Sequence, residues 1–477
     1  MSRSLEIASV SLLLIMGAFF ATYHLKESPP VWYDEGFYVQ SAANLATYGQ
    51  TGLRVAPESI EPSSKLITVG YPLIYPLAGW FQAFGVSVLS ARSLMVLFIL
   101  GFLLVGYFLV KRLFGPGSAL GALALLATLP TLYGNGKSVL GEVPALLYMV
   151  LSLLFLNIAL SSTMRKSLWL VLAGLLAGLC VATKPTFLLL IPAIAVGVFL
   201  EWRRKTLSVK EILIAAGAGT LPLLLWLLLQ FQGGDSLVGV LLFYANPYQL
   251  PNLSEVILGN IQRLFIGIGP LYLMGVMGVW LCALWIRLRR RETIRIGEIT
   301  ILAFSILSIA SYLRTAGWYR YLFEAQALSL LFFPSALLVV TQSIVRFVSP
   351  KRVVAAVIAV LTIFGTYQVM FSSFVAESYD RDKTSFLEAY FDNEPPTTSF
   401  FVYNVPEVAI FIRGTNYYQY IDAAGWYIGR EQLSAIAEGK VDKIILGTDA
   451  YANKAEDAFG LYKVATTTHD YTILEKI

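Results

Sequence analysis

The chain has 477 residues, of which 57% are hydrophobic and 14% are charged, and its net charge is +5. A soluble domain carries about 25% charged residues, so the composition excludes an ordinary soluble protein and predicts an integral membrane protein. Its two cysteines, Cys180 and Cys282, both fall in apolar segments, which argues against a disulfide framework or a cysteine metal site. The basic residues fall between apolar segments, so the positive charge requires no nucleic acid partner.

Eleven apolar segments are candidates for membrane-spanning helices, which need about 20 mostly apolar residues. The first lacks a small-x-small cleavage pattern at Ala21-Thr22-Tyr23, so we interpret it as an uncleaved helix rather than a signal peptide. The expected spans are 5–23, 90–110, 118–133, 143–160, 167–183, 185–200, 211–231, 265–286, 298–313, 322–342 and 353–374.

Lysine and arginine concentrate in every second short connection between these spans. By the positive-inside rule, that side is cytoplasmic. The N-terminus then lies in the cytoplasm, whereas the long loop 24–89 and the C-terminal residues 375–477 lie outside. The basic residues that define the cytoplasmic side are Arg3, Lys111, Arg112, Arg165, Lys166, Arg203, Arg204, Lys205, Lys210, Arg287, Arg289, Arg290, Arg291, Arg295, Arg346, Lys351 and Arg352.

An acidic pair, Asp34-Glu35, lies among aromatic residues in the stretch 31–50 of the first long loop. Helical spacing places Tyr38, Ala42 and Leu45 on one face, which predicts a helix in the membrane interface. An acid at a helix start is often only a cap, but an acidic pair among aromatics at a membrane surface favours a functional role.

Three further ionisable positions lie at loop–helix junctions of the same predicted outer face. Glu142 precedes Pro144 at the start of an apolar helix, Lys184 stands between two apolar runs, and Arg320 lies beside Tyr321. Each has a structural alternative: complementing the helix dipole, a snorkelling lysine, or an interface anchor. Their convergence from separate loops predicts a site at the external face.

The C-terminal residues 375–477 have the composition of a soluble domain, so we divide the chain into a membrane domain, 1–374, and an extracytoplasmic α/β domain, 375–477. The tail contains no glycine-rich phosphate loop. Its expected elements are strands at 399–403 and 443–446, short helices at 406–412 and 432–438, and a hairpin of 461–464 with 471–474.

The order of these features resembles the GT-C superfamily of membrane glycosyltransferases, in particular the branch of the protein O-mannosyltransferases and the aminoarabinose transferases. The chain departs from the family pattern at Glu142, where aspartate is commoner, and at Gly70-Tyr71-Pro72. The segments that carry the resemblance are Asp34-Glu35 with Tyr38, Gly70 to Leu77, Phe84 to Ser87, Ala91-Arg92, Arg112 to Gly115, Leu140 to Pro144, Lys184, and Arg320-Tyr321-Leu322.

The resemblance implies a GT-C fold with interfacial helices in the first external loop, and an inverting hexosyl- or pentosyltransferase. Its donor would be a sugar on a polyprenyl phosphate, and its acceptor an external hydroxyl. Asp34 would act as the general base. Glu35 and Glu142 would orient the acceptor, bind sugar hydroxyls, or raise the proton affinity of Asp34 by charge repulsion. Cations would stabilise the leaving phosphate. The implied phosphate-binding residues are Lys184, Arg320 and Lys65, and the implied substrate-binding residues are Tyr38, Tyr71 and Tyr321.

No cofactor is required by this reading. Three carboxylates could gather around a divalent cation, but without histidine support we favour a metal-free mechanism. The expected location is the plasma membrane of a prokaryote. Two other classes stay open. Charged residues also mark the paths of transporters and flippases, although these usually lie at mid-membrane on broken helices. A noncatalytic binder of sugar lipids is the third reading.

Overall fold

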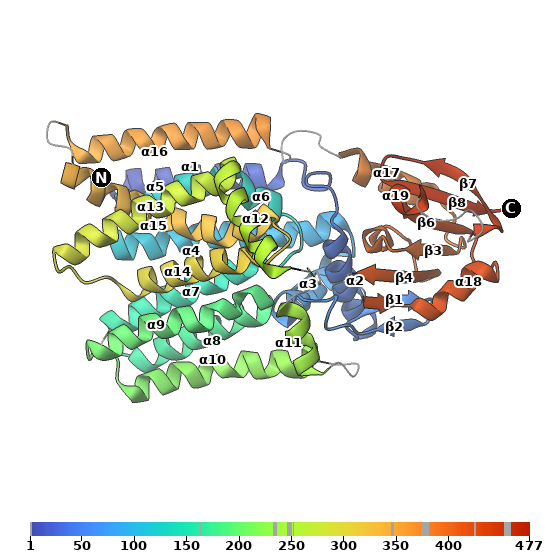
Figure 1. Ribbon diagram of the computed structural model, residues 1–477, viewed down its shortest axis with the longest axis horizontal. Helices are drawn as coiled ribbons and strands as arrows, with labels where there is room; N and C mark the ends of the chain where they lie inside the picture. The colour runs from blue at the N-terminus through green and yellow to red at the C-terminus, as the bar shows by residue number, and fades with distance from the viewer. Residues whose placement is uncertain are drawn as a thin grey trace.

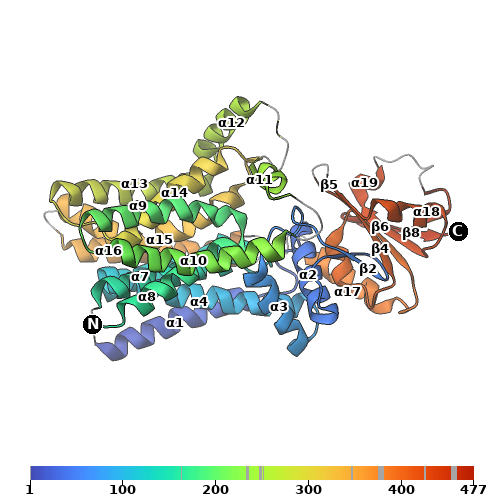
Figure 2. The same ribbon diagram turned by 90° about the horizontal axis from the view of Figure 1, so that it is seen from below.

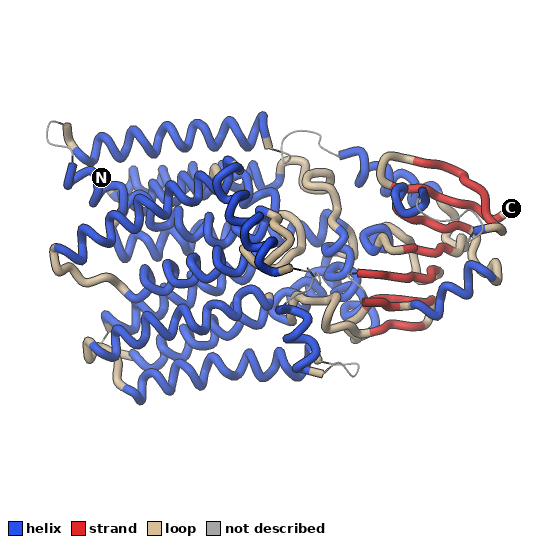
Figure 3. Tube along the Cα trace, in the orientation of Figure 1, coloured by secondary structure: helices blue, strands red, loops and turns tan. Residues whose placement is uncertain are grey.

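The computed structural model describes residues 2–162, 164–231, 236–245, 250, 252–344, 348–373, 381–423, 426–452 and 459–477. A bundle of long helices carries a β-sheet domain at one end (Figure 1). The N-terminus lies at the end of the bundle far from the sheet, and the C-terminus lies at the outer edge of the sheet domain. Figure 3 shows that the helical and sheet regions are clearly separated along the long axis.

Within the described residues, nine helical segments are long and apolar enough to cross a membrane. The nine are α1 (Arg3–Thr22), α4 (Val88–Phe114), α7 (Glu142–Ser161), α8 (Lys166–Thr183), η1 with α9 (Pro185–Arg203), α10 (Val209–Gln230), α13 (Ile268–Arg289), η2 with α15 (Tyr319–Ile344) and α16 with η3 (Pro350–Ser372).

The other two expected spans are also helical, but each differs from a full straight span. Residues 118–133 belong to two helices, α5 (Pro116–Ala127) and α6 (Pro130–Gly136), that meet at an angle of 57°. Proline lacks an amide hydrogen and clashes with the preceding turn, so Pro130 starts a new helix rather than extending α5. The second of these two spans, expected at 298–313, corresponds to α14 (Ile296–Tyr312). This helix has 17 residues and is shorter than the length of about 20 residues that a span needs.

Small residues allow close packing in the bundle, most clearly between α8 and α10. A Cβ atom at Gly174 would lie 2.1 Å from the carbonyl oxygen of Ala215, and one at Gly178 would lie 2.3 Å from that of Gly219. Such spacing of small residues lets the backbones of membrane helices approach each other. Shorter helices α11 (Leu237–Ala245) and α12 (Leu253–Ile266) lie near the end of the bundle that faces the sheet.

The first long loop forms two helices near the junction of the bundle and the sheet domain, and a hairpin that lies beside β4 of the sheet domain (Figures 1 and 2). These are α2 (Tyr33–Tyr48), the antiparallel strands β1 (Leu53–Ala56) and β2 (Ser59–Glu61), and α3 (Tyr71–Phe84). The sequence predicts that α2 lies on the membrane interface. In the structure, α2 is packed between α3 and the sheet domain, and Phe37, Tyr38 and Ala42 are buried. The position of α2 in the membrane interface stays a prediction.

The C-terminal region is a six-stranded mixed sheet with the strand order β5-β4-β3-β6-β8-β7. The central strand β3 runs parallel to β4 and β6, and β6, β8 and β7 are antiparallel neighbours. The elements are α17 (Arg381–Asn393), β3 (Phe400–Tyr403), η4 (Pro406–Ile410), β4 (Tyr417–Ala423), β5 (Trp426–Ile428), η5 (Arg430–Leu433), α18 (Ser434–Ala437), β6 (Lys443–Gly447), α19 (Thr448–Ala452), β7 (Tyr462–Thr467) and β8 (Tyr471–Lys476).

Both faces of this sheet are covered, as expected for central parallel strands. Successive strand residues point to opposite faces, so Val402 packs with Phe391 of α17, whereas Phe401 packs with Ile436 of α18. The expected small α/β domain is therefore confirmed as a fold. The predicted boundary between residues 374 and 375 lies outside the described residues.

Candidate active site

The acidic pair lies in the first turn of α2. Trp32 has an extended backbone and precedes the helix, and Glu35 Oε2 accepts a hydrogen bond from the Trp32 amide at 3.3 Å. Both carboxylates therefore sit where the helix dipole favours negative charge. At the other end of the helix, Gly49 has φ +71°, a conformation that favours glycine and ends α2.

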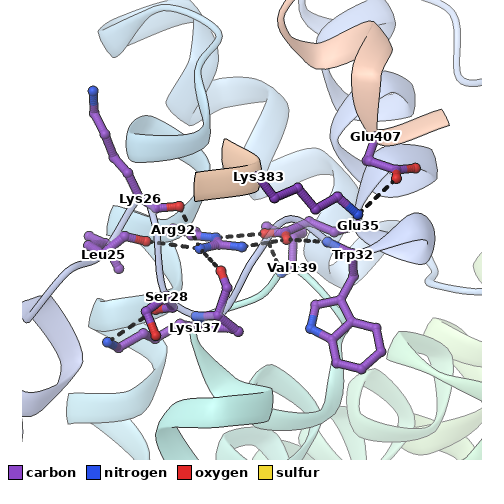
Figure 4. A network of polar contacts seen from close by, with 11 residues as sticks. Leu25, Lys26, Ser28, Trp32, Glu35, Arg92, Lys137, Val139, Lys383 and Glu407 are labelled. Carbon is purple, nitrogen blue, oxygen red and sulfur yellow. Dashed lines mark hydrogen bonds and ion pairs between the residues drawn. The ribbon is translucent and has the colours of Figure 1, made fainter. Parts of the chain in front are cut away.

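Glu35 belongs to a buried network of hydrogen bonds rather than to a solvent-accessible site (Figure 4). Its side chain is 1% exposed, and its two oxygens accept from the Arg92 guanidinium at 3.0 and 2.8 Å. The Val139 amide donates to Glu35 Oε1 at 3.2 Å. Nη1 of Arg92 also donates to the backbone carbonyls of Leu25, Lys26 and Pro29. These contacts favour a positioning role for Glu35 over the direct substrate contact that the resemblance implies.

Asp34 points to a more open place than Glu35. Its side chain is 35% exposed, and its Oδ2 lies 3.2 Å from Nη2 of Arg320, which comes from η2 (Tyr319–Leu322). Aromatic rings surround the Arg320 guanidinium, whose carbon lies 5.1 to 5.5 Å from the ring centroids of Trp32, Trp318 and Tyr321. Stacking on aromatic faces suits arginine and fixes the direction of its donors.

A second ion pair joins Glu142 to Lys184. Glu142 is the first residue of α7, after Gly141 with φ +88°, and Lys184 follows α8. The Lys184 ammonium lies 2.5 Å from Glu142 Oε1 and donates to the Leu140 carbonyl at 2.9 Å. Among the described residues, Glu142 Oε2 is buried and has no hydrogen-bond partner.

The two ion pairs belong to one electrostatic cluster. The charges of Asp34 and Glu142 both act on Arg320 and on Tyr38. Tyr38 is 3% exposed, and its hydroxyl lies 2.7 Å from Thr68 Oγ1. Burial first, and then the Asp34 charge, raise the pKa of Tyr38 well above its ordinary value, so its hydroxyl stays protonated. Tyr321 is held by Arg320, which donates to its hydroxyl at 3.4 Å.

Glu324 is a member of this cluster that the sequence analysis missed. It lies in the first turn of α15 (Phe323–Ile344), is 5% exposed, and interacts electrostatically with Glu142, Lys184 and Arg320. The available signal was a carboxylate in an otherwise apolar helix, four residues after Arg320. Such a residue is a functional candidate by default.

The two remaining predicted residues make contacts of other kinds. The Lys65 ammonium lies 3.1 Å from the ring centroid of Trp426, at the junction of the first loop and β5. Tyr71 packs edge-on against Tyr75, at 6.2 Å between ring centroids, and both line a small cavity of about 40 Å³ with Gln230. Among the described residues, these contacts do not place Tyr71 beside the carboxylates of Asp34, Glu35 or Glu142.

One further buried polar group borders the site. Within the described parts of the chain, Trp32 Nε1 is buried and has no hydrogen-bond partner, like Glu142 Oε2. Buried polar groups are normally paired, so a bound molecule with hydroxyl groups could satisfy both atoms. The residues that the structure describes contain no group of three or more His, Cys, Asp or Glu side chains that could hold a metal ion. The metal-free mechanism favoured from the sequence stays a prediction.

Comparison with known proteins supports the resemblance inferred from sequence. Residues 72–228 match a family described as dolichyl-phosphate-mannose-protein mannosyltransferase. No curated protein matches the chain.

Among solved structures, the chain is similar to ArnT from Cupriavidus metallidurans bound to undecaprenyl phosphate. The TM-score is 0.65 at 11% identity, over 100% of this chain and 99% of that one. It is also similar to the Archaeoglobus fulgidus oligosaccharyltransferase in its apo form, with a TM-score of 0.58 at 13% identity, over 94% of this chain and 70% of that one. The similarity extends to AglB from Archaeoglobus fulgidus in complex with an inhibitory peptide and a dolichol-phosphate, with a TM-score of 0.57 at 14% identity over the same shares. These likenesses establish a shared fold. The chain thus has the fold of the GT-C superfamily and is similar to its ArnT-like and protein-mannosyltransferase-like members.

Proposed function

We propose that this protein is an integral-membrane glycosyltransferase that moves a sugar from a polyprenyl-phosphate donor to an acceptor hydroxyl at the external membrane face. The observation that carries the proposal is the cluster of two carboxylate–cation pairs, Asp34–Arg320 and Glu142–Lys184, at the end of the bundle nearest the sheet. Structural neighbours bound to undecaprenyl phosphate and to a dolichol-phosphate support the donor class.

The residues of the cluster suit a single displacement. The acceptor oxygen attacks the anomeric carbon, its proton passes to the Asp34 carboxylate, and the bond between sugar and phosphate oxygen breaks. The polyprenyl phosphate leaves with the electron pair of that bond. Asp34 is the carboxylate in the cluster with substantial exposure, as a general base that must reach its substrate requires.

Arg320 and Lys184 are the groups suited to the donor phosphate. Each now pairs with a carboxylate and could turn to a phosphate, where it would stabilise the charge that develops on the leaving group. When Arg320 turns to the phosphate, Asp34 is released to accept a proton. Arginine binds phosphate oxygens with a rigid fork of donors, whereas lysine acts as a point charge.

The position of the charges favours transfer over transport. Asp34, Glu142, Lys184 and Arg320 lie at helix ends and loops, not at the middle of broken spans as in many transporters. From the distribution of lysine and arginine, we place the N-terminus in the cytoplasm and the sheet domain outside. The membrane that we propose is the plasma membrane of a prokaryote, in keeping with the family resemblance.

The test uses purified full-length protein and a panel of radiolabelled undecaprenyl-phosphate sugars. The expected result is release of undecaprenyl phosphate from one donor in the presence of a membrane acceptor fraction. Asp34→Asn should reduce that release at least about 10²-fold, the range typical of a lost general base, and should retain donor binding. Absence of binding to every donor would contradict the proposal and favour a transporter.

A further inference from the structure

The sheet domain contacts the helix that carries Asp34. We propose that this domain is a positioning element of the active site, which sets the orientation of Asp34 through Asn404 and through the close contact of Gly36 with η4. The inference rests on the proposed function, because it assigns a role in that reaction. Tyr33, Gly36 and Asn404 are positioning residues in this account.

The first contact is a hydrogen bond one residue from Asp34. The Tyr33 hydroxyl donates to Asn404 Oδ1 at 2.6 Å. Burial first, and then the charges of Glu407 and Asp34, raise the pKa of Tyr33, so it stays protonated as a donor. A shift of the sheet domain would therefore act directly on the first turn of α2.

Asn404 is itself fixed to the sheet. It follows β3 with φ +54°, a conformation that asparagine tolerates better than most residues. Its backbone amide donates to the Tyr420 carbonyl at 2.7 Å, and its Oδ1 also accepts from the Asp422 amide at 2.9 Å. The side chain that holds Tyr33 thus belongs to the rigid β3–β4 pair.

The second contact is steric. A Cβ atom at Gly36 would lie 2.4 Å from the Glu407 backbone nitrogen and 2.6 Å from the Pro406 carbonyl carbon. One turn later, Gln40 Nε2 donates to the Pro406 carbonyl oxygen at 2.7 Å. The helix therefore meets the backbone of η4 at a distance that only glycine permits.

A buried network within the sheet domain also holds the η4 segment in place. Glu407 is 4% exposed, and its Oε1 accepts from the Tyr471 hydroxyl at 2.8 Å and lies 3.2 Å from the Lys383 ammonium. Figure 4 shows the Lys383–Glu407 pair beside the turn of α2 that carries Glu35. On its other side, α2 is tied to α4 by the Glu35–Arg92 pair. Asp34 is thus carried by a helix that is held from two directions.

The test compares full-length variants with a matched control. Gly36→Ala, Tyr33→Phe and Asn404→Gly disturb the contact, whereas Gly79→Ala changes an exposed helical glycine of α3 whose Cβ would meet nothing within 4 Å. With the undecaprenyl-phosphate sugar that wild type uses, we expect kcat to fall about 100-fold in Gly36→Ala, as for a misplaced catalytic group. In each of the other two variants kcat should fall about 10-fold.

Two features separate positioning from general damage. The donor KM should stay within about twofold of wild type, because Arg320 and Lys184 lie outside the sheet domain. The double variant Tyr33→Phe with Asn404→Gly should be little slower than the slower single variant, because both substitutions remove the same hydrogen bond between Tyr33 and Asn404. Unchanged kcat in Gly36→Ala and Tyr33→Phe, or a donor KM that rises by the same factor as kcat falls, would overturn the inference.

Hydrogen exchange of the α2 amides gives a readout that needs no donor. Gly36→Ala and Asn404→Gly should speed exchange at residues 34–40 at least about 10-fold relative to Gly79→Ala. If wild type turns over no donor, the proposed function fails, and exchange still decides the inference. Unchanged protection of α2 would then refute the positioning role.

Discussion

Asp34 and Glu35 are neighbours in the sequence, but their carboxylates have opposite surroundings. Glu35 is 1% exposed and bonded to Arg92 and two backbone amides, whereas Asp34 is 35% exposed and contacts one guanidinium nitrogen. Successive residues of an α-helix point about 100° apart. The comparison shows how one acidic pair can divide its work: the buried carboxylate fixes the helix to the bundle, and the exposed one faces the cluster of charges.

The largest expected difference between the two carboxylates is in stability. Glu35→Gln leaves the Arg92 charge buried without its partner, and should lower the free energy of unfolding by about 3–5 kcal/mol. Asp34→Asn breaks a partly exposed pair, and should change it by at most about 1 kcal/mol. Thermal unfolding of the two purified variants checks this. Equal stability of the two would contradict the division between a sealed and an open carboxylate.

The next largest effect concerns Arg320, the cation that pairs with Asp34. Arg320→Lys keeps the charge but loses the planar fork and the stacking on three rings, so affinity for undecaprenyl phosphate should fall about tenfold. Titration of tryptophan fluorescence measures the affinity. The matched control is Arg314→Lys, which changes an exposed arginine of the same connection. Equal affinities in the two variants would remove Arg320 from the phosphate site.

Glu324→Gln sharpens the comparison by removing a buried titratable carboxyl group from the cluster that contains Asp34. Ionisation of Glu324 as the pH rises adds a negative charge beside Glu142 and the proposed phosphate site, so its removal should extend the basic limb of the pH profile of kcat/KM to higher pH. We expect a change in the maximal rate of only about threefold, because Glu324 would act through its charge alone. Glu255→Gln, on the exposed face of α12, is the control. An unmoved basic limb would place Glu324 outside the working cluster.

The smallest effect is a pH dependence of stability. Burial and the Asp34 charge raise the pKa of Tyr38 in the folded protein, whereas in the unfolded chain tyrosine ionises near pH 10. Below pH 10 both states hold the proton, and stability does not depend on this group. As the pH rises above about 10, the unfolded chain releases the proton first and stability falls. Tyr38→Phe should therefore flatten the loss of thermal stability at high pH, and an unchanged slope would argue against it.

The fold was largely predictable because its main signals are local. Each of the eleven expected spans coincides with a helical region, although only the structure shows that Pro130 divides one of them. In the tail, the run Lys443 to Leu446 identifies β6. The runs at 461–464 and 471–474 identify the β7–β8 hairpin. Strand β4 was missed because its polar residue Gln419 obscures the pattern. Gln419 is fully buried and is paired with Gln40 of α2, a partner too distant in sequence for a local signal.

The site was predictable where a charge marked a loop–helix junction. Asp34, Glu142, Lys184 and Arg320 were all found in this way, and the structure brings them into one cluster. Glu324 was missed because an acid in the first turn of a helix is also a common helix-dipole partner. The pairing of Glu35 with Arg92 was not predicted, because adjacency to Asp34 carries no information about a partner 57 residues away in the sequence.

The most direct test of the central claim is a comparison of single-turnover release and donor binding in Asp34→Asn and wild type. The undecaprenyl-phosphate sugar identified from the panel would be used for both proteins, at equal amounts of folded protein. The account predicts that Asp34→Asn binds this donor with wild-type affinity and releases undecaprenyl phosphate at least about 10²-fold more slowly. Release at the wild-type rate by Asp34→Asn would contradict the assignment of Asp34 as the base.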